Sequence, residues 1–351
     1  MLVYLDNAQS IAPGSVPPFE RRVRQEPRRR RRGLDRFPDS AMATLRARMP
    51  TGLNENYARE LLELHTMGVD GGYTQQDVVN VARILTGWSI RRPLGESGGP
   101  DRRAAGGYRF NEWAHDRGRK IVLGAEFPAG GGEDEGLRLL TMLASHAATM
   151  HFVSAKLCAR FVNDVPPDGC VDAAVAAWRH SGGDVRSILR ALVRSAEFWA
   201  PANIGTKVKT PFEFVVSAVR ALGGIPSSNP ALALAVGRLG QPLYLQSAPT
   251  GYPETQADWV NSGALLARMN FAVALAAGRL PGVAIDLDRV APPTSDPETL
   301  IRSIDREILG GRMNPNTHAV ILREIGSEGS PAGARALAIG LALGAPEFQR
   351  Q

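Results

Sequence analysis

Acidic and amide side chains recur on one face of a predicted helix at residues 54–67. At 100° per residue, Asn56, Glu60 and Glu63 fall in one sector of about 60°. Two carboxylates on one face can share a proton as general acid and base, or hold a divalent cation between them. This pattern therefore has a catalytic interpretation.

The same helix also has a structural interpretation. Glu55, Arg59 and Glu63 repeat every four residues, the spacing of surface ion pairs worth a few tenths of a kcal/mol. His65 lies on the flank of the apolar stripe, about 140° from Glu60, so these two residues are not ligands of one site without help from another segment. A histidine at such a place is typical of a hydrogen-bonded core residue.

His115 and Asp116 are the other candidates for catalysis, and they lie in a polar turn. Adjacent side chains usually diverge, so we expect each to serve a site that another segment completes. The zinc spacing H-E-x-x-H is absent, as are the sequence signatures of α/β-hydrolases, P-loop NTPases and dinucleotide-binding proteins. The sequence therefore favours none of the common reaction classes.

Two helices joined by a turn position the first group of residues. Apolar residues repeat at helical spacing up to Gly68, which supplies a stop. Thr74 and Asp77 resemble a capping box with Asp in place of Glu, which predicts that a second helix begins there. This second helix buries one apolar stripe, formed by Val78, Val81, Ala82, Leu85 and Trp88.

Helical periodicity dominates the rest of the chain. Short strands are expected at residues 108–110 and 120–123, where they would form a hairpin. Further helices are expected at residues 135–146, 149–163, 170–181, 184–196, 211–222, 230–238, 256–278, 298–309, 314–325 and 331–343, with an irregular stretch at 240–253. The sequence thus predicts an all-α, multi-helix domain of paired helices, with one small β-hairpin near residues 108–123.

The predicted organisation has four segments. They are an amino-terminal segment at residues 1–18, an arginine-rich segment at 19–37 that we expect to be disordered, a main helical domain at 38–280, and carboxy-terminal helices at 281–351 that pack on the main domain.

The net charge of +6 has a local origin, because residues 21–36 hold nine arginines and only two acidic residues. A nucleic-acid-binding domain usually spreads its cations over a folded face and interleaves aromatic residues, a pattern that this chain lacks. We therefore expect no specific nucleic-acid binding. A weaker hypothesis is that Arg21–Arg32 tethers the chain to anionic membranes or nucleic acid.

The chain has two cysteines, Cys158 and Cys170, too few for a disulfide-rich scaffold or for a zinc cluster built from thiolates alone. Cys158 falls inside a helical pattern, where a free cysteine usually serves as a small buried apolar group. The longest apolar run, at residues 336–345, is about half of the roughly 20 residues that a membrane helix needs. We predict no transmembrane segment, and the first ten residues contain no signal peptide.

The segment GLNENYARELLELHTMGVDGGYTQQDVVNVARILTGW, at residues 52–88, resembles the signature of a bacterial family, the domain of unknown function 1800 family. Further segments agree in order: MLVYLDNAQS at 1–10, YRFNEWAHDRGRKIVLG at 108–124, LASHAATMHFVSAKLCARFV at 143–162 and GQPLYLQSAPTGYPETQADW at 240–259. Members of the family carry a longer helical region before the position of Met1, so we expect this chain to be truncated at its start.

The resemblance implies an α-helical protein, commonly exported to the periplasm or the exterior. It also implies a separately encoded partner that resembles phosphatases and sulfatases, but no established reaction. Besides Glu60, Glu63, His115 and Asp116, the motif draws attention to Asn54, Glu55, Asn56, Arg59, His65, Asp70, Asp77 and Arg83.

Two hypotheses of function remain open. In the first, the protein is an exported hydrolase in which Glu60 or Glu63 acts as acid or base, His115 or Asp116 assists, and a divalent cation is the candidate cofactor. It expects Glu60 and His115 to lie within about 8 Å of each other in a concave site. In the second, the protein is a non-catalytic binding or assembly protein that acts with the partner, and it expects a fully paired polar network without an open pocket.

Overall fold

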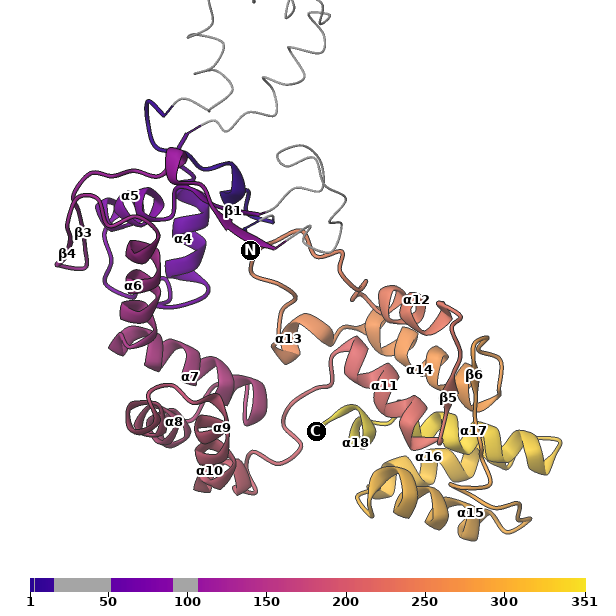
Figure 1. Cartoon of the computed structure of the whole chain (residues 1–351). Coiled ribbons are helices and arrows are strands. Elements are labelled where there is room, and N and C mark those ends of the chain that lie inside the picture. The colour runs from indigo at the N-terminus through magenta and orange to yellow at the C-terminus, as the bar shows by residue number, and fades with distance from the viewer. Residues whose placement is uncertain (3, 16–51, 91–106) are drawn as a thin grey trace, which may run out of the picture. The chain divides into compact units, whose positions relative to one another are not determined.

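The computed structural model describes residues 1–2, 4–15, 52–90 and 107–351 (Figure 1). The arginine-rich segment lies outside these residues. The chain divides into two compact units, Met1–Ala155 with Ala174–Ile188, and Lys156–Ala173 with Leu189–Gln351. The boundary that we predict at residue 280 stays a prediction.

The protein is mostly helical, as predicted, with small two-stranded sheets. In chain order the α-helices are α4 (Glu55–Glu63), α5 (Gln75–Ile84), α6 (Glu133–Ala144), α7 (Ala147–Phe161), α8 (Asp168–Ser181), α9 (Val185–Arg194), α10 (Ala196–Trp199), α11 (Pro211–Ala221), α12 (Ala231–Arg238), α13 (Gln256–Trp259), α14 (Ser262–Ala276), α15 (Pro297–Ile304), α16 (Pro315–Ile325), α17 (Pro331–Gly344) and α18 (Pro346–Gln349). The single helix expected at 256–278 is two helices, because Val260 and Asn261 have extended backbone between α13 and α14. The helix expected at 298–309 is α15 followed by a π-helical turn, η4 (Asp305–Leu309).

The strands at 108–110 and 120–122 occur where the sequence predicts them, but they do not pair with each other. The antiparallel pairs are β1 (Trp88–Ile90) with β2 (Tyr108–Phe110), β3 (Lys120–Val122) with β4 (Ala125–Phe127), and β5 (Ile225–Pro226) with β6 (Val283–Ala284). Leu123 and Gly124 both have positive φ and form the two-residue turn that folds β4 back onto β3. Gly87, with φ of 82°, follows the end of α5, so Trp88 begins a strand instead of ending the predicted helix.

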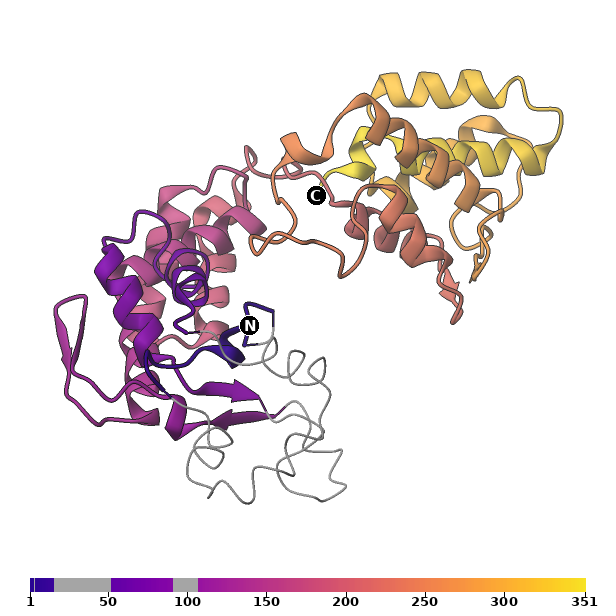
Figure 2. The same ribbon diagram turned by 90° about the horizontal axis from the view of Figure 1, so that it is seen from above.

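The core of the first unit lies between α4, α5 and α6. The buried stripe predicted for the second helix is present, and it packs against Leu61 and Leu62 of α4 and Leu139 and Leu143 of α6. Gly136 of α6 allows a close approach, because a Cβ atom there would lie 2.2 Å from the ring of Trp88. Both views place the start of the chain beside β1 (Figure 1, Figure 2).

The core of the second unit is built from α11, α12 and α14 to α17. Its central contact is that of α14 with α17, which carry Ala272 and Ala342 in the fully buried layer between them. Gly340 permits this contact, since a Cβ atom there would lie 2.8 Å from the Cα atom of Val273. The second unit thus has a hydrophobic core of its own.

The two cysteines form a disulfide bond between α7 and α8. Both side chains are fully buried, as expected for Cys158, but the interpretation of Cys158 as a free cysteine is wrong. The reason is the chain reversal between the two helices, which brings the Cα atoms of Cys158 and Cys170 to 6.1 Å from each other. The spacing of the cysteines in the sequence does not reveal this reversal.

Candidate functional site

Polar side chains of α5, spaced by three residues, bind the backbone of residues 119–123. The contacts are Asp77 Oδ1 with the Leu123 N–H (2.7 Å), Asn80 Nδ2 with the Ile121 carbonyl (2.7 Å) and Arg83 Nη2 with the Arg119 carbonyl (3.3 Å). Residues three apart lie on one helix face, and alternate residues of a strand point their backbone groups to one side. The polar side chains on one face of α5 therefore form hydrogen bonds with the backbone along one edge of β3.

Asp77 also begins α5. Its Oδ2 accepts the N–H and the hydroxyl of Thr74, and the Thr74 hydroxyl accepts the Asp77 N–H, which confirms the predicted capping box. Burial acts to raise the pKa of Asp77, but the hydrogen bonds from Leu123 and Thr74 outweigh burial and lower it. The ionised carboxylate is thus bound as a structural acceptor.

Arg83 and Asp116 form a two-bond ion pair. Arg83 Nε lies 2.8 Å from Asp116 Oδ2, and Arg83 Nη2 lies 3.2 Å from Oδ1, which also accepts the Gly118 N–H. Burial acts to raise the pKa of Asp116, but the hydrogen bonds from Arg83 and Gly118 outweigh it and lower the pKa. Asp116 is therefore a carboxylate with its bonding positions occupied.

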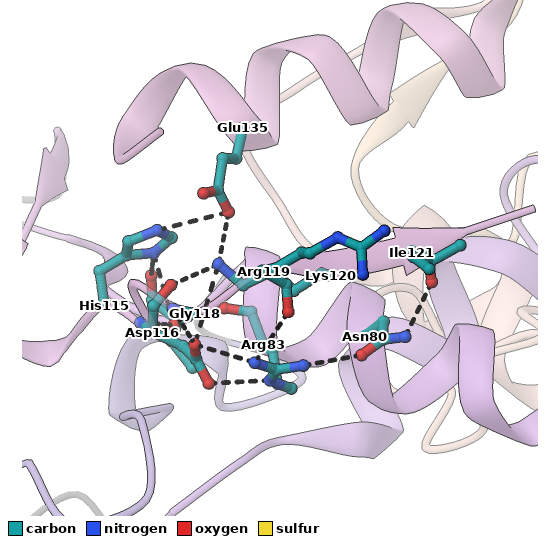
Figure 3. A network of polar contacts seen from close by, with 10 residues as sticks. Asn80, Arg83, His115, Asp116, Gly118, Arg119, Lys120, Ile121 and Glu135 are labelled. Carbon is teal, nitrogen blue, oxygen red and sulfur yellow. Dashed lines mark hydrogen bonds and ion pairs between the residues drawn. The ribbon is translucent and has the colours of Figure 1, made fainter. Parts of the chain in front are cut away.

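A second ion pair, between Lys120 and Glu135, is deeply buried. Lys120 Nζ lies 2.5 Å from Glu135 Oε2, and it also donates to the Asp116 carbonyl. Glu135 Oε1 accepts the Gly131 N–H at 3.1 Å. Lys120, Glu135 and His115 point toward one another from β3, α6 and the preceding turn (Figure 3).

His115 completes this cluster. Its Nδ1 lies 3.0 Å from the Thr86 carbonyl, which can only accept, so Nδ1 carries a proton and Nε2 is the acceptor in the neutral ring. Nε2 lies 3.6 Å from Glu135 Oε2 and has no hydrogen-bond partner among the described residues. Burial lowers the pKa of His115, and nearby Lys120 lowers it further, against raising effects from the Thr86 hydrogen bond, Glu135 and Asp116.

The cluster balances its charges, and its inner part is closed to solvent, whereas the side chains of Arg83 and Asp116 are 25% and 14% exposed. Two cations, Arg83 and Lys120, face two carboxylates, Asp116 and Glu135, around the neutral His115. The side chains of Lys120 and His115 are 0% exposed, and that of Glu135 is 3% exposed. The Lys120–Glu135 pair joins β3 to α6, and Arg83 with Asp116 joins α5 to the turn before β3.

The burial of His115 predicts a pH-dependent stability. Because the folded protein holds the pKa of this residue below its ordinary value of 6.5, the unfolded chain binds the proton more readily. We expect the free energy of unfolding to fall as the pH drops below about 6.5, and to fall less steeply in a His115→Asn variant. Urea titrations at several pH values measure both slopes. Equal slopes for the two proteins would contradict the burial of a neutral His115.

The candidate residues at the start of α4 contact α5 and the first residues of the chain, not the cluster around His115. Asn54 is the N-cap, because its Oδ1 accepts the Tyr57 N–H and its Nδ2 donates to the Leu5 carbonyl. Gln75 of α5 bridges Glu55 and Arg59 with hydrogen bonds of 2.9 and 2.6 Å. These side chains fasten α4 to α5 and to the start of the chain, and Glu55 and Arg59 bind Gln75 in place of the ion pair that their four-residue spacing suggests.

Glu60 and Glu63, the carboxylates of the proposed acid–base pair, are not bonded to the cluster around His115 among the described residues. Within the described part of the chain, no hydrogen bond or ion pair joins Glu60 or Glu63 to His115 or Asp116. Glu60 and Glu63 are half-buried, and Glu63 lies near Tyr73, whose pKa is raised by burial and then by this carboxylate. The exposed candidates are Glu55, Asn56, His65 and Asp70. His65 lies beyond the end of α4, so its interpretation as a core residue is wrong.

Sequence reasoning missed half of the network, namely Thr86, Asn80, Lys120 and Glu135. Asn80 had a signal, because it lies midway between two singled-out residues of α5, at the same three-residue spacing. Lys120 and Glu135 had none, because a charged residue is rarely buried and their pairing joins a strand to a helix. Among the described residues, no three His, Cys, Asp or Glu side chains are grouped so as to hold a metal ion.

Comparison with known proteins gives one family. The model of the family described as "Protein of unknown function (DUF1800)" matches residues 1–350. No curated protein and no solved structure matches the chain. None of the helices in the part of the chain that the structure describes is long and apolar enough to cross a membrane.

Proposed function

We propose that this chain, which belongs to the DUF1800 family, is a non-catalytic binding or assembly protein that acts outside the cytoplasm with a separately encoded partner. The observation that carries the proposal is the closed network around Lys120. Each of its cations is paired with a carboxylate, Arg83 with Asp116 and Lys120 with Glu135, as the assembly hypothesis expects. The one polar atom of the cluster without a hydrogen-bond partner among the described residues is Nε2 of the buried His115.

The network supports this function by its position. Asp77, Asn80 and Arg83 fasten α5 to the β3–β4 hairpin, while Glu135 fastens α6 to the same hairpin through Lys120. A scaffold held by buried charge pairs has one defined packing arrangement, because any other packing leaves a charge unpaired. A rigid scaffold lowers the entropy cost of binding a partner.

The disulfide bond between Cys158 and Cys170 supports an extracytoplasmic location. Disulfides persist in the periplasm and outside the cell, and they are rare in the reducing cytosol. Family resemblance independently implies export. We therefore propose that the protein works in an oxidising compartment, with the bond formed.

The partner proposed from the family resemblance is a protein that resembles phosphatases and sulfatases. The test is co-expression of the full chain with such a protein encoded beside it, followed by size-exclusion chromatography with light scattering. We expect a complex of defined stoichiometry, which persists in a Glu60→Gln variant. Two proteins that elute separately at micromolar concentration would overturn the proposal.

A hydrolase that uses α4 is the second candidate. It is favoured by Glu60, a half-buried carboxylate whose side chain has no hydrogen-bond or ion-pair partner among the described residues. The same preparations can be assayed on phosphate, sulfate and carboxylate esters. Hydrolysis that the Glu60→Gln variant loses, without loss of stability, would support this candidate against the assembly function.

A further inference from the structure

Helix α9 and the short helix α10 carry exposed basic and apolar side chains. Arg190 and Arg194, one turn apart on α9, are exposed. Within the described residues neither guanidinium has a hydrogen-bond or ion-pair partner. The helix also holds the exposed Arg186 and no acidic residue.

Trp199 lies directly against this end of α9. Its indole Nε1 donates to the Val193 carbonyl at 2.7 Å, while 64% of the residue remains exposed. Val193 itself lies next to Arg194 and is also exposed. Trp199 is therefore held in place by its only polar atom, while most of its apolar surface stays in water. Such exposure is unusual for a tryptophan.

Two more exposed apolar residues lie on segments joined to α10. Asn203 Nδ2 donates to the Glu197 carbonyl of α10, and Asn203 Oδ1 accepts from Asn163 Nδ2 at 3.0 Å. Ile204 directly follows Asn203 in the chain, and the N–H of Val165 donates to Asn163 Oδ1 at 3.2 Å. Ile204 and Val165 are 59% and 78% exposed. Of the carboxylates nearby, Asp164 binds Lys207, while the side chain of Glu197 on α10 has no hydrogen-bond or ion-pair partner among the described residues.

We propose that Arg190, Arg194, Val193, Trp199, Ile204 and Val165 form a membrane-docking patch that binds the surface of an anionic bilayer. In it, the guanidinium groups bind lipid phosphates, and the tryptophan and the aliphatic side chains enter the boundary between headgroups and acyl chains. The protein is then a peripheral membrane protein on this face of its second unit.

Charge and side-chain type together select this occupant. An aqueous polyanion such as nucleic acid would use the arginines, but it gives no reason for exposed isoleucine and valine. A protein partner of the usual kind would make an apolar contact centred on Trp199, and its carboxylates would face the arginines at the rim. It would not require the aliphatic residues Ile204 and Val165 in addition. A bilayer offers phosphates and an apolar layer at adjacent depths, which matches arginines beside aliphatic residues.

The test uses the full chain and large unilamellar vesicles of phosphatidylglycerol and phosphatidylcholine in equal amounts, with partitioning measured by sedimentation. Loss of an arginine near an anionic surface weakens partitioning about fivefold, so we expect roughly thirtyfold weaker binding for the double variant R190Q/R194Q. The matched control R220Q/R238Q removes two exposed arginines of α11 and α12 and is expected to bind like the wild type.

A second readout locates the tryptophan. Brominated phosphatidylglycerol quenches only indoles that enter the acyl region, so we expect vesicles of this lipid to quench the wild type and to quench a Trp199→Phe variant far less, although four other tryptophans remain. Equal quenching of these two proteins, or equal partitioning of R190Q/R194Q and R220Q/R238Q, overturns the proposal. The second result would assign vesicle binding to another part of the chain.

Discussion

A Glu135→Leu substitution is expected to lower the free energy of unfolding by about 3–5 kcal/mol, because it leaves a buried ammonium group without its carboxylate. The side chain of Lys120 is 0% exposed and lies 2.5 Å from Glu135. Among the described residues, the other polar contacts of its ammonium group are the Asp116 carbonyl and Asp116 Oδ1 at 3.9 Å, which do not replace a direct ion pair. Urea denaturation followed by far-ultraviolet circular dichroism measures the loss.

Two controls separate the effect of the unpaired charge from that of a changed side chain. The double variant Lys120→Met with Glu135→Leu removes both charges, and we expect it to be much more stable than the single variant, because apolar replacement of a complete buried pair is often neutral or stabilising. A Glu126→Gln variant breaks the exposed pair of Arg119 with Glu126 on the same hairpin and should leave the denaturation midpoint unchanged. A single variant as stable as the double variant would contradict the buried pair.

These expectations depend on contacts that the sequence reveals only in part. The presence of most helices was predictable, because caps and apolar periodicity are local signals, whereas the breaks at Val260–Asn261 and before Trp88 were not. Thr74 and Asp77 begin α5 as predicted, and the irregular stretch at 240–253 lacks a long helix. Strand pairing was less predictable. Two strands of three residues carry no information about their partners, and the pairing of β1 with β2 depends on Gly87 ending the preceding turn.

The candidate site likewise contains residues that the sequence reveals and residues that it does not. Asp77, Arg83, His115 and Asp116 were identified from a motif, and they belong to one network. The network also requires Lys120, which the sequence presents only as the first residue of a strand. Nothing local distinguishes a lysine that points into a core from one that points into water, because its burial is decided by where Glu135 of α6 lies.

Removal of the disulfide bond is expected to lower the free energy of unfolding by about 3 kcal/mol. The bond closes a short loop, with a sequence separation of 12 residues between Cys158 and Cys170, and loop-closure entropy in the unfolded chain sets the size of this effect. The double variant Cys158→Ala with Cys170→Ala tests the expectation by urea denaturation. Mass spectrometry after alkylation without reduction should detect no modified cysteine in the wild type.

The reduced wild type is the control that assigns the loss to the cross-link. Both sulfur atoms are fully buried, so the alanine variant loses packing contacts as well as the covalent bond. The difference between oxidised and reduced wild type measures the cross-link alone, and the difference between reduced wild type and the variant measures packing. If oxidised and reduced protein unfold at the same denaturant concentration, the turn between α7 and α8 is held by its other contacts, and the disulfide no longer supports an extracytoplasmic function.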